Sequence, residues 1–389
     1  MLQKDVVIVG AGMVGLSLAL ALYNKGIQVV IVEAGKIHAK KLSNDRVETR
    51  VSAINHNSQN FLKELDVWSS IKDERVSPYY TMRVWDDTPD EYINITAEEI
   101  SEHSLGHIVE NQLIVDSLLN KIRSTDIQIL ENSKINEIQR YKDTVRVKFD
   151  DLEIEANLLV GADGANSFVR DYFNFPTKVK AYDHTAIVAT LELEKSHEAT
   201  AYQRFYDKGV LAFLPLEDQK RASIVWSLKS EYANYINSLD DSDFEKELSK
   251  AINGTLGEVK LLSKRFSFPL AERHAKEYIQ DRVVLVGDAC HTIHPLAGQG
   301  INLGFKDVQV LVDVLSEAFE KGRILGALST LDKYQRQRKL DNTKMIYLMK
   351  AFKEVFASNN SVISSLRKFG LNFVNKNNLV KKTIVKQAL

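Results

Sequence analysis

The feature that constrains the fold most is a strand, turn, helix and second strand at the start of the chain. Residues 6–9, Val-Val-Ile-Val, form a short β-branched run of the kind found in fully buried strands. A glycine-rich turn follows, then a helix predicted to run to about Lys25, and then a second buried strand over residues 27–32. This pattern predicts an α/β fold.

Three glycines in the turn and one acid after the second strand indicate what kind of ligand this unit binds. Gly10, Gly12 and Gly15 have the spacing G-x-G-x-x-G. The first glycine permits a tight turn, the second lets backbone approach a pyrophosphate, and the third lets the helix pack on the strand. Glu33 ends the second strand, where a carboxylate can accept ribose hydroxyls. We interpret the segment as a dinucleotide site rather than a chance glycine cluster, although the motif does not distinguish FAD from NAD.

Composition excludes several classes of protein. The 389 residues carry a formal net charge of −1, so no global field draws the chain to nucleic acid. The single cysteine, Cys290, permits no internal disulfide and no zinc site by itself. The apolar run over residues 6–22 resembles an export signal or short membrane span, but glycines interrupt it and no small-residue cleavage site follows. We therefore predict a globular protein without a metal.

Later segments predict further sheets and a helical end. Alternating patches over residues 134–159 suggest an antiparallel insertion that leads into a buried strand. Residues 185–228 have high β-propensity and are expected to form a separate sheet. Another buried strand is expected over residues 282–286, a long helix near Asn302, and helix after about Leu331.

Two acid–glycine turns follow buried strands in this middle part of the chain. Asp163 lies in Gly161-Ala162-Asp163-Gly164, with Arg170 beyond. Gly287-Asp288 leads into a glycine-rich loop over residues 294–304. An acid at the end of a strand can hold a ribityl hydroxyl, and a glycine loop that opens a helix can place N–H groups against a reduced flavin. These turns favour FAD.

On these motifs the chain resembles the class A flavoprotein monooxygenases, and specifically the ubiquinone-biosynthesis hydroxylase family. Residues 294–307 match the family pattern H-P-x-A-G-Q-G-x-N-x-G-x-x-D at every fixed position. Further matches lie at residues 50–55, 84–86, 105–111 and 212–216. The resemblance implies a Rossmann-like FAD-binding domain of the p-hydroxybenzoate hydroxylase type, interleaved with an α+β substrate domain. We expect residues 1–75, 98–178 and 265–340 in the FAD-binding domain, residues 76–97 and 179–264 in the substrate domain, and a helical C-terminal region over residues 341–389.

The resemblance also implies roles for individual residues. Arg50 and Asn111 would contact FAD near the pyrophosphate and ribityl chain, with Gln112 as an alternative to Asn111. The complete expected cofactor set is Gly10, Gly12, Gly15, Glu33, Arg50, Asn111, Asp163, Gly287, Asp288, Pro295, Gly298, Gln299, Gly300 and Asn302. Of these, Pro295, Gly298 and Gln299 would position the reaction along the isoalloxazine. Cys290 replaces the alanine common in relatives and is interpreted as a small buried residue, and neither His291 nor His294 is expected to be catalytic.

The implied activity is aromatic hydroxylation with FAD, NADPH or NADH, and dioxygen, by way of a flavin hydroperoxide. The implied substrate is a polyprenylated phenol, hydroxylated at ring position 5, and the position-6 enzyme of the same pathway is the alternative. A flavin oxidase or dehydrogenase, and a non-catalytic FAD-binding subunit of the biosynthetic complex, are the two other readings.

The C-terminal part of the chain is strongly basic. From Arg336 to Leu389 there are twelve Lys or Arg residues and two acids, with apolar residues at helical spacing between them. Such a segment can pack on the body of the protein with a solvated basic face. It can equally dock on an anionic membrane surface or on the ubiquinone-biosynthesis complex. We expect a cytoplasmic protein that can lie peripherally at the inner membrane.

Overall fold

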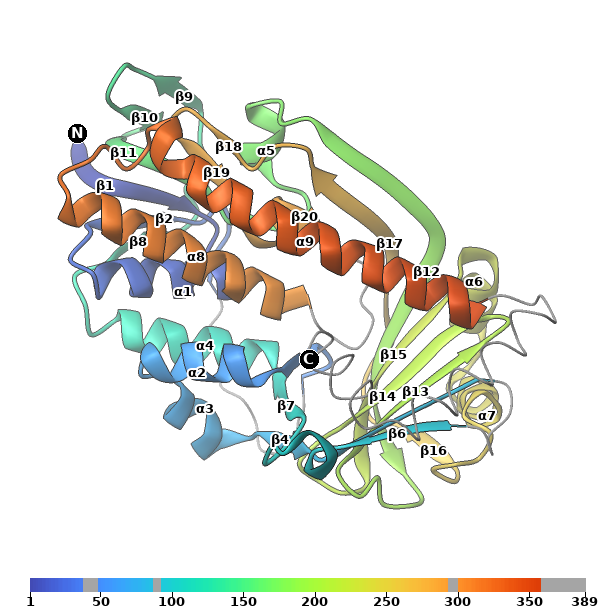
Figure 1. The fold of residues 1–389 in the computed structure, drawn as a ribbon. Coiled ribbons are helices and arrows are strands. Elements are labelled where there is room, and N and C mark those ends of the chain that lie inside the picture. Colours follow the sequence, from blue (N-terminus) through green and yellow to red (C-terminus); the bar gives the residue numbers. More distant parts are fainter. Residues whose placement is uncertain (38–47, 87–91, 293–299, 358–389) are drawn as a thin grey trace.

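A computed structural model describes residues 1–37, 48–86, 92–292 and 300–357, and the side chains of the last helix as far as residue 345. Within these ranges the chain forms three sheets and a set of helices that lie largely on one side of the first sheet (Figure 1).

The first sheet has a parallel core that begins with the predicted β-α-β unit. Strand β1 (Leu2–Val9) pairs in parallel with β2 (Val29–Val32) and with β11 (Glu153–Gly161). Residues 6–9 of β1 are buried on both faces, which is why the run is apolar throughout rather than alternating. The sheet order β18-β19-β11-β1-β2-β8 is completed by β8 (Gln128–Leu130), β18 (Ile279–Gln280) and β19 (Val283–Leu285).

Three of the predicted segments are present, one as a helix beside this sheet and two as strands within it. The helix after the glycine turn is α1 (Met13–Tyr23). The predicted antiparallel insertion is formed by β9 (Glu137–Arg140) and β10 (Val145–Lys148), and β10 pairs antiparallel with β11. The buried strand expected over residues 282–286 is β19. The α/β prediction is therefore confirmed.

Helices from distant parts of the chain stack beside α1. It contacts α4 (Asn111–Ile122) and α8 (Gly300–Glu320), and α8 in turn contacts α9 (Leu328–Ala357). Three shorter helices also belong to this part of the fold: α2 (His56–Glu64), α3 (Trp68–Glu74) and α5 (Phe168–Tyr172).

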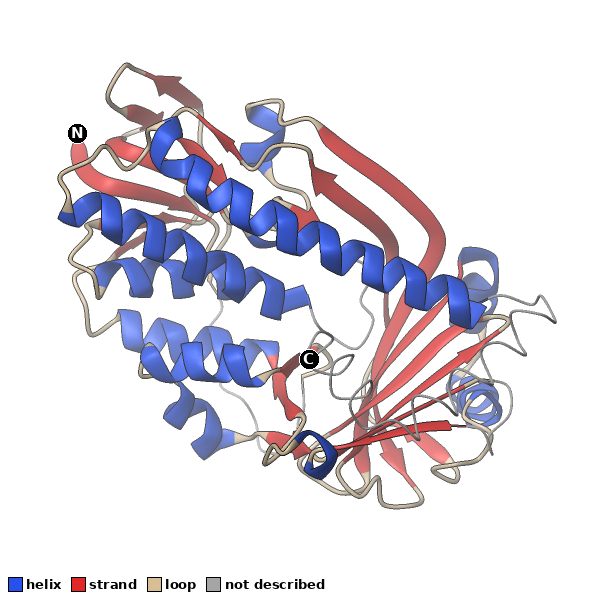
Figure 2. Ribbon diagram, in the orientation of Figure 1, coloured by secondary structure: helices blue, strands red, loops and turns tan. Residues whose placement is uncertain are grey.

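The second sheet has nine strands in the order β20-β17-β12-β15-β14-β13-β5-β6, with β16 beside β12. It curves away from the first sheet, and α6 (Ser230–Ser238) and α7 (Asp241–Ala251) cover one of its faces (Figure 2). Trp226 and Phe244 pack there with ring centroids 5.8 Å apart. The strands are β5 (Thr81–Trp85), β6 (Tyr92–Thr96), β12 (Thr177–Leu193), β13 (Thr200–Tyr206), β14 (Gly209–Pro215), β15 (Arg221–Lys229), β16 (Val259–Leu261), β17 (Phe266–Ala275) and β20 (His291–Thr292).

A small third sheet connects the two larger ones. It contains β3 (Val51–Ile54), β4 (Ser77–Tyr79) and β7 (Gly106–Glu110) in the order β3-β7-β4. Two single-turn 3-10 helices, at Glu98–Ile100 and Gly287–Ala289, complete the elements.

The division of the chain into two units stays a prediction, and two elements bear on its boundaries. Strand β17 belongs to the second sheet, where it pairs along its length with β12, although its residues fall in the segment expected to bind FAD. Helix α9 runs without a break across residue 341, where the C-terminal region was expected to begin. Among the described residues, no helix is long and apolar enough to span a membrane.

Candidate functional site

The glycine turn after β1 is built by close backbone packing. Gly10 has φ +108°, and a Cβ placed on it would lie 2.5 Å from the carbonyl oxygen of Ala162. A Cβ on Gly15 would lie 1.9 Å from the carbonyl oxygen of Gly10. Neither position can hold a side chain while α1 keeps its place against the strands. These two glycines set the shape of the turn.

Gly12 differs from the other two glycines. A Cβ placed there would meet no atom of the described residues within 4 Å. Gly12 is also the N-cap of α1, and within the described ranges no side chain caps the first backbone N–H groups of that helix. Free N–H groups and the positive end of the helix dipole favour an anion at such a terminus. The residues at this turn fit the pyrophosphate of FAD.

Glu33 lies beside this turn, at the end of β2. Its Oε2 accepts a hydrogen bond from the backbone N–H of Ala11 at 2.8 Å, and its Oε1 accepts one from Gly35 at 3.0 Å. The carboxylate is half-buried and keeps further acceptor capacity, because each oxygen has two lone pairs. Its position against the turn fits the role expected for a ribose ligand.

Arg50 and Asn111 are brought together at the start of β3 and α4. The backbone N–H of Asn111 donates to the carbonyl of Arg50 at 3.0 Å, and the hydroxyl of Ser52 donates to Oδ1 of Asn111 at 2.6 Å. The Arg50 side chain is exposed. Burial raises the pKa of the Asp288 carboxyl and the positive charge of Arg50 opposes that rise, so these two expected cofactor residues lie in the same region.

An ion pair between Glu110 and Arg75, next to this segment, was not predicted from the sequence. The Glu110 carboxylate lies 2.9 Å from Nε of Arg75 and also accepts the backbone N–H of Glu48 at 2.8 Å. Burial raises the pKa of Glu110, and Arg75 opposes that shift. Glu110 thereby holds the chain just before Arg50. It was missed because Arg75 is far from it in sequence and the pairing depends on how β4 and β7 align.

Asp163 is mainly a structural member of its turn. Its carboxylate accepts hydrogen bonds from the hydroxyl of Ser167 at 2.5 Å and from the backbone N–H of Val169 at 3.1 Å, and burial raises its pKa. Its Cα would lie 2.9 Å from a Cβ on Gly10, so the turn adjoins the glycine turn. Arg170 donates to the carbonyl of Ala289 at 3.3 Å, which ties this turn to the one that carries Asp288.

Gly287 and Asp288 form a tight turn after β19. Gly287 has φ +60°, and its N–H donates to Oδ2 of Asp307 at 2.9 Å. Asp288 is exposed to solvent but is surrounded by protein, which raises the pKa of its carboxyl, while His291 and Arg50 act in the opposite direction. An exposed carboxylate held beside an exposed arginine fits a ligand that carries hydroxyls and phosphates.

The loop that was expected to line the isoalloxazine lies partly outside the described residues. This applies to Pro295, Gly298 and Gln299, and to His294. Gly300 begins α8, and a Cβ placed on it would meet no atom of the described part of the chain within 4 Å. Asn302, in the first turn of α8, accepts the N–H of Asn55 at 3.2 Å and donates to the carbonyl of Ala53 at 2.8 Å. Asn302 thus joins α8 to the third sheet.

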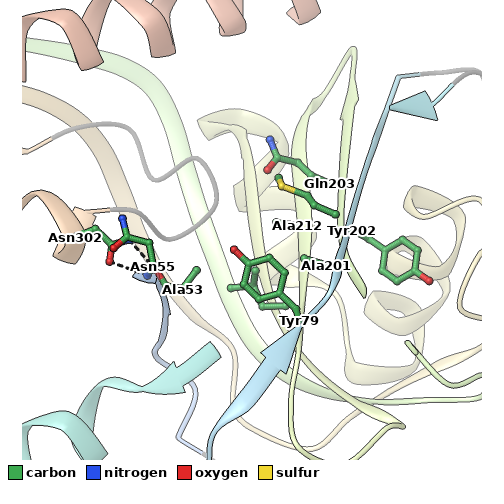
Figure 3. Close-up of a pocket in the computed structure, with 10 residues that line it drawn as sticks. Ala53, Asn55, Tyr79, Ala201, Tyr202, Gln203, Ala212 and Asn302 are labelled. Atoms are coloured by element: carbon green, nitrogen blue, oxygen red, sulfur yellow. Dashed lines mark hydrogen bonds between the residues drawn. The ribbon is translucent and has the colours of Figure 1, made fainter. Parts of the chain in front are cut away.

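A pocket opens next to Asn302, between α8 and the second sheet. Including its open mouth, it contains about 450 Å³ of space. Asn55 and Asn302 lie on one side, and Tyr79 and Gln203 lie on the other (Figure 3). The described residues that line it are Ala53, Asn55, Tyr79, Met82, Ala201, Tyr202, Gln203, Ala212, Leu214 and Asn302. None of these side chains is charged at neutral pH, so the described part of the lining suits an uncharged ring.

Cys290 and His291 lie near the site, and both are buried in positions that indicate a structural role. Cys290 is fully buried, and burial raises its pKa well above the ordinary value, which makes it unreactive. His291 is buried and bonded to Asp307, with 2.6 Å between Nε2 and Oδ2. In the part of the chain that is described, no group of three His, Cys, Asp or Glu side chains is placed to hold a metal.

Comparisons with known proteins agree with this geometry. The family model described as "FAD binding domain" matches residues 3–347. The chain is 32% identical to 3-demethoxyubiquinol 3-hydroxylase of Escherichia coli (strain K12), over 99% of this chain and 98% of the relative. It is also 32% identical to the mitochondrial ubiquinone biosynthesis monooxygenase COQ6 of Danio rerio, over 95% of this chain and 86% of the relative.

A solved structure extends the agreement to the fold. The p-nitrophenol 4-monooxygenase PnpA of Pseudomonas putida DLL-E4 superposes with a TM-score of 0.81, covering 99% of this chain and 97% of that one at 17% identity. The predicted fold class, a Rossmann-like FAD-binding fold of the p-hydroxybenzoate hydroxylase type, is confirmed. The chain belongs to the FAD-dependent monooxygenases, in the family of the ubiquinone-biosynthesis hydroxylases.

Proposed function

We propose that this monooxygenase hydroxylates the aromatic ring of a polyprenylated phenol in ubiquinone biosynthesis, with NADPH or NADH as the electron donor. The observation that carries the proposal is the uncharged pocket beside Asn302. A substrate with a carboxylate on its ring would need a cation to replace its hydration, and the described residues of the lining offer none. An alkylated phenol needs only apolar contact and a few hydrogen bonds.

Some of the residues around the site are assigned to the cofactor and others to the substrate. When bound, FAD supplies the electron transfer and oxygen activation. We assign the N-terminus of α1 at Gly12 to the pyrophosphate, Glu33 to the ribose, and Asp288 with Arg50 to the ribityl and phosphate region. Asn302 fixes the start of α8 against Ala53 and Asn55, and so sets the distance between the cofactor side and the second sheet. The apolar lining excludes water from the ring.

The position that is hydroxylated is the finer part of the proposal. The segments around Arg50 and residues 106–111 most resemble the enzyme that acts at ring position 5, and we propose that position. The Escherichia coli relative is named 3-demethoxyubiquinol 3-hydroxylase, so relatives of this chain do not all carry the same ring assignment. The position-6 hydroxylase of the same pathway is the competing proposal.

A membrane-borne substrate also needs a route to the pocket. We propose that the basic C-terminal segment brings the protein to an anionic membrane surface or to the biosynthetic complex, which would place the enzyme in the cytoplasm and peripherally at the inner membrane. Residues 358–389 of this segment lie outside the described residues, so this part of the proposal depends on composition alone.

The test is turnover of FAD-loaded protein with a short-chain prenylphenol, NADPH or NADH, and isotope-labelled dioxygen. We expect one labelled oxygen atom in the product by mass spectrometry, and NMR of that product gives the ring position. The control is Glu33→Arg, which should fail to retain FAD. NADPH oxidation that the phenol accelerates without labelling the ring would favour the oxidase alternative. Deletion of the gene and identification of the accumulating quinone precursor would show the natural substrate.

A further inference from the structure

The second sheet places one polar side chain in an otherwise apolar row. Residues that pair directly across adjacent strands point to the same face of a sheet. Gln203 on β13 pairs with Ala212 on β14 and with Val84 on β5. The register continues outward through both neighbours to give the row Val188, Val225, Ala212, Gln203, Val84 and Ile93. Gln203 is the polar member of this row.

The side chain of Gln203 has an unsatisfied hydrogen-bond acceptor. The residue is 6% exposed, and its Oε1 accepts no hydrogen bond within the described part of the chain. Leaving a buried carbonyl unpaired costs free energy, so such an atom in a folded protein calls for an explanation. Of the unpaired buried side-chain atoms in the described ranges, this is the one that belongs to a residue lining the pocket beside Asn302.

The surroundings of Gln203 indicate what would pair with it. Met82, Ala201, Ala212 and Leu214 line the pocket on the same sheet and offer only apolar contact. Tyr79 lies on the same side of the pocket as Gln203, while the Tyr202 side chain turns away from the pocket (Figure 3). Burial raises the pKa of Tyr79, so its phenol stays protonated and neutral. A ligand that satisfies Gln203 must therefore present a neutral donor on an otherwise apolar, flat body.

We propose that Gln203 is a substrate-contacting residue that selects a phenol by accepting the hydrogen bond of its ring hydroxyl. This inference rests on the proposed function and adds an orientation to it. The hydroxyl faces β13 and the opposite edge of the ring faces Asn302. A carboxamide oxygen accepts the phenolic hydrogen bond without taking the proton, which leaves the ring neutral and its oxygen electron-rich. A methyl ether of the same ring has no hydrogen to donate and leaves Oε1 unpaired.

The experiment compares a short-chain prenylphenol with its O-methyl ether on FAD-loaded protein. Binding is measured by calorimetry and by the rise in unfolding temperature, and hydroxylation is followed separately. We expect wild type to bind the phenol about tenfold more tightly than the ether, the discrimination of one neutral hydrogen bond. Gln203→Leu has a similar volume and no acceptor, so it should bind both ligands equally.

Thr190→Val is the matched control. Thr190 lies on β12 of the same sheet, is 2% exposed, and has an unpaired Oγ1, but it does not line the pocket. Both variants replace an unpaired buried polar group with an apolar one, so both should raise the unfolding temperature of the ligand-free protein. Only Gln203→Leu should lose the preference for the phenol.

The possible outcomes distinguish a failure of the role given to Gln203 from a failure of the proposed function. If wild type hydroxylates the phenol but Gln203→Leu keeps the full preference over the ether, Gln203 does not read the hydroxyl and the inference is overturned. If wild type binds neither ligand, the pocket is wrongly assigned and the proposed function fails with it. Loss of preference in Thr190→Val as well would also overturn the inference, because the effect would then be general to the sheet.

Discussion

Arg338 on α9 donates from Nε to Oδ1 of Asp307 on α8 at 2.7 Å, and both side chains are buried. The other carboxylate oxygen of Asp307 accepts the backbone N–H of Gly287 and bonds to His291. One buried carboxylate therefore connects the last described helix to the turn that carries Asp288. The flavin side of the site depends on how two distant helices pack.

Removing the charge of Asp307 should strongly destabilise the protein. Asp307→Asn removes the fully buried carboxylate that Arg338 faces and leaves Asp341, at 2.8 Å, as the remaining acid beside Arg338. Breaking a buried ion pair typically costs about 3–5 kcal/mol in the free energy of unfolding, and the contact with Asp341 should place this loss at the lower end. Denaturant unfolding of the FAD-loaded protein measures this. Glu317→Gln is the control, because Glu317 pairs with Lys321 and Lys333 at an exposed site and should change stability little. Equal effects of the two substitutions would contradict the role given to Asp307.

The same carboxylate should give stability a dependence on pH. Burial alone would raise the pKa of Asp307, but His291 and Arg338 together hold it below the ordinary value of 3.8. A group whose pKa is lower in the folded state stabilises the fold above its unfolded pKa and loses this contribution as pH falls through its folded pKa. The stability difference between wild type and Asp307→Asn should therefore be constant above about pH 5 and shrink below 3.8.

Two other buried acids do not disturb this comparison. The pKa values of Glu110 and Asp163 are raised in the folded protein, so their protonation favours the fold as pH falls. Asp307 is not among the causes of either shift, so these two contributions cancel in the difference. A difference that stays constant down to about pH 3 would mean that Asp307 is not held ionised in the way its contacts indicate.

The three glycines of the turn should separate folding from cofactor binding. Gly10→Ala forces a side chain into a left-handed conformation, at a cost of about 1–3 kcal/mol, and against the carbonyl of Ala162. Gly15→Ala drives a methyl group into the carbonyl of Gly10. The methyl group of Gly12→Ala meets no atom of the residues that the structure describes, so this variant should fold normally. It should weaken FAD binding by about 10- to 100-fold, because the methyl keeps the phosphates from the N–H groups.

The unfolding temperature of the apoprotein and equilibrium dialysis with FAD should be measured for all three glycine variants. The expected pattern is two unstable variants and one stable variant with weak FAD binding. A stable Gly12→Ala protein with wild-type affinity for FAD would remove the pyrophosphate from the N-terminus of α1.

The sequence could predict the elements whose signals are local. The β-branched run at residues 6–9, the glycines after it and the acid at Glu33 lie in one short stretch, and the structure has the strand, turn and helix there. The antiparallel insertion and the long helix after the glycine loop were predicted for the same reason, although α8 begins at Gly300 rather than near Asn302. Residue type and order suffice where the contacts are between neighbours in the chain.

Contacts set by packing between distant elements could not be predicted. Asp307 was recognised as the end of a motif, but its partner Arg338 depends on how α8 and α9 lie against each other. Gln203 was not noticed, because its place in an apolar row depends on the register of strands from separate parts of the chain. Strand β17 was not predicted, and its pairing with β12 joins residues that are far apart in the chain.

The C-terminal segment contains two regions that a truncation must keep apart. Asn342, just past residue 341, is buried, accepts a hydrogen bond from Nη2 of Arg338 at 2.8 Å and donates to the hydroxyl of Tyr278 at 3.3 Å. A chain that ends at Asp341 would lose these contacts to the Asp307 network and should be unstable. A chain that ends at Ala357 keeps all of α9 and removes only residues 358–389. Those residues include six basic side chains and no acid, namely Arg367, Lys368, Lys376, Lys381, Lys382 and Lys386.

We therefore expect the chain that ends at Ala357 to retain FAD and to hydroxylate a short-chain prenylphenol at a rate close to wild type. It should lose most turnover of a long-chain precursor in anionic lipid vesicles, because each methylene taken from the bilayer into water costs about 0.8 kcal/mol and docking at the membrane avoids that transfer. Assays in soluble and vesicle form, run side by side, measure the two rates. Replacing the six basic residues with glutamine in the full-length chain is the matched control, since it removes the charge and keeps the length. Equal loss of both activities in the shortened chain would mean that residues 358–389 support the fold, and full activity on vesicles would mean that the segment does not deliver substrate.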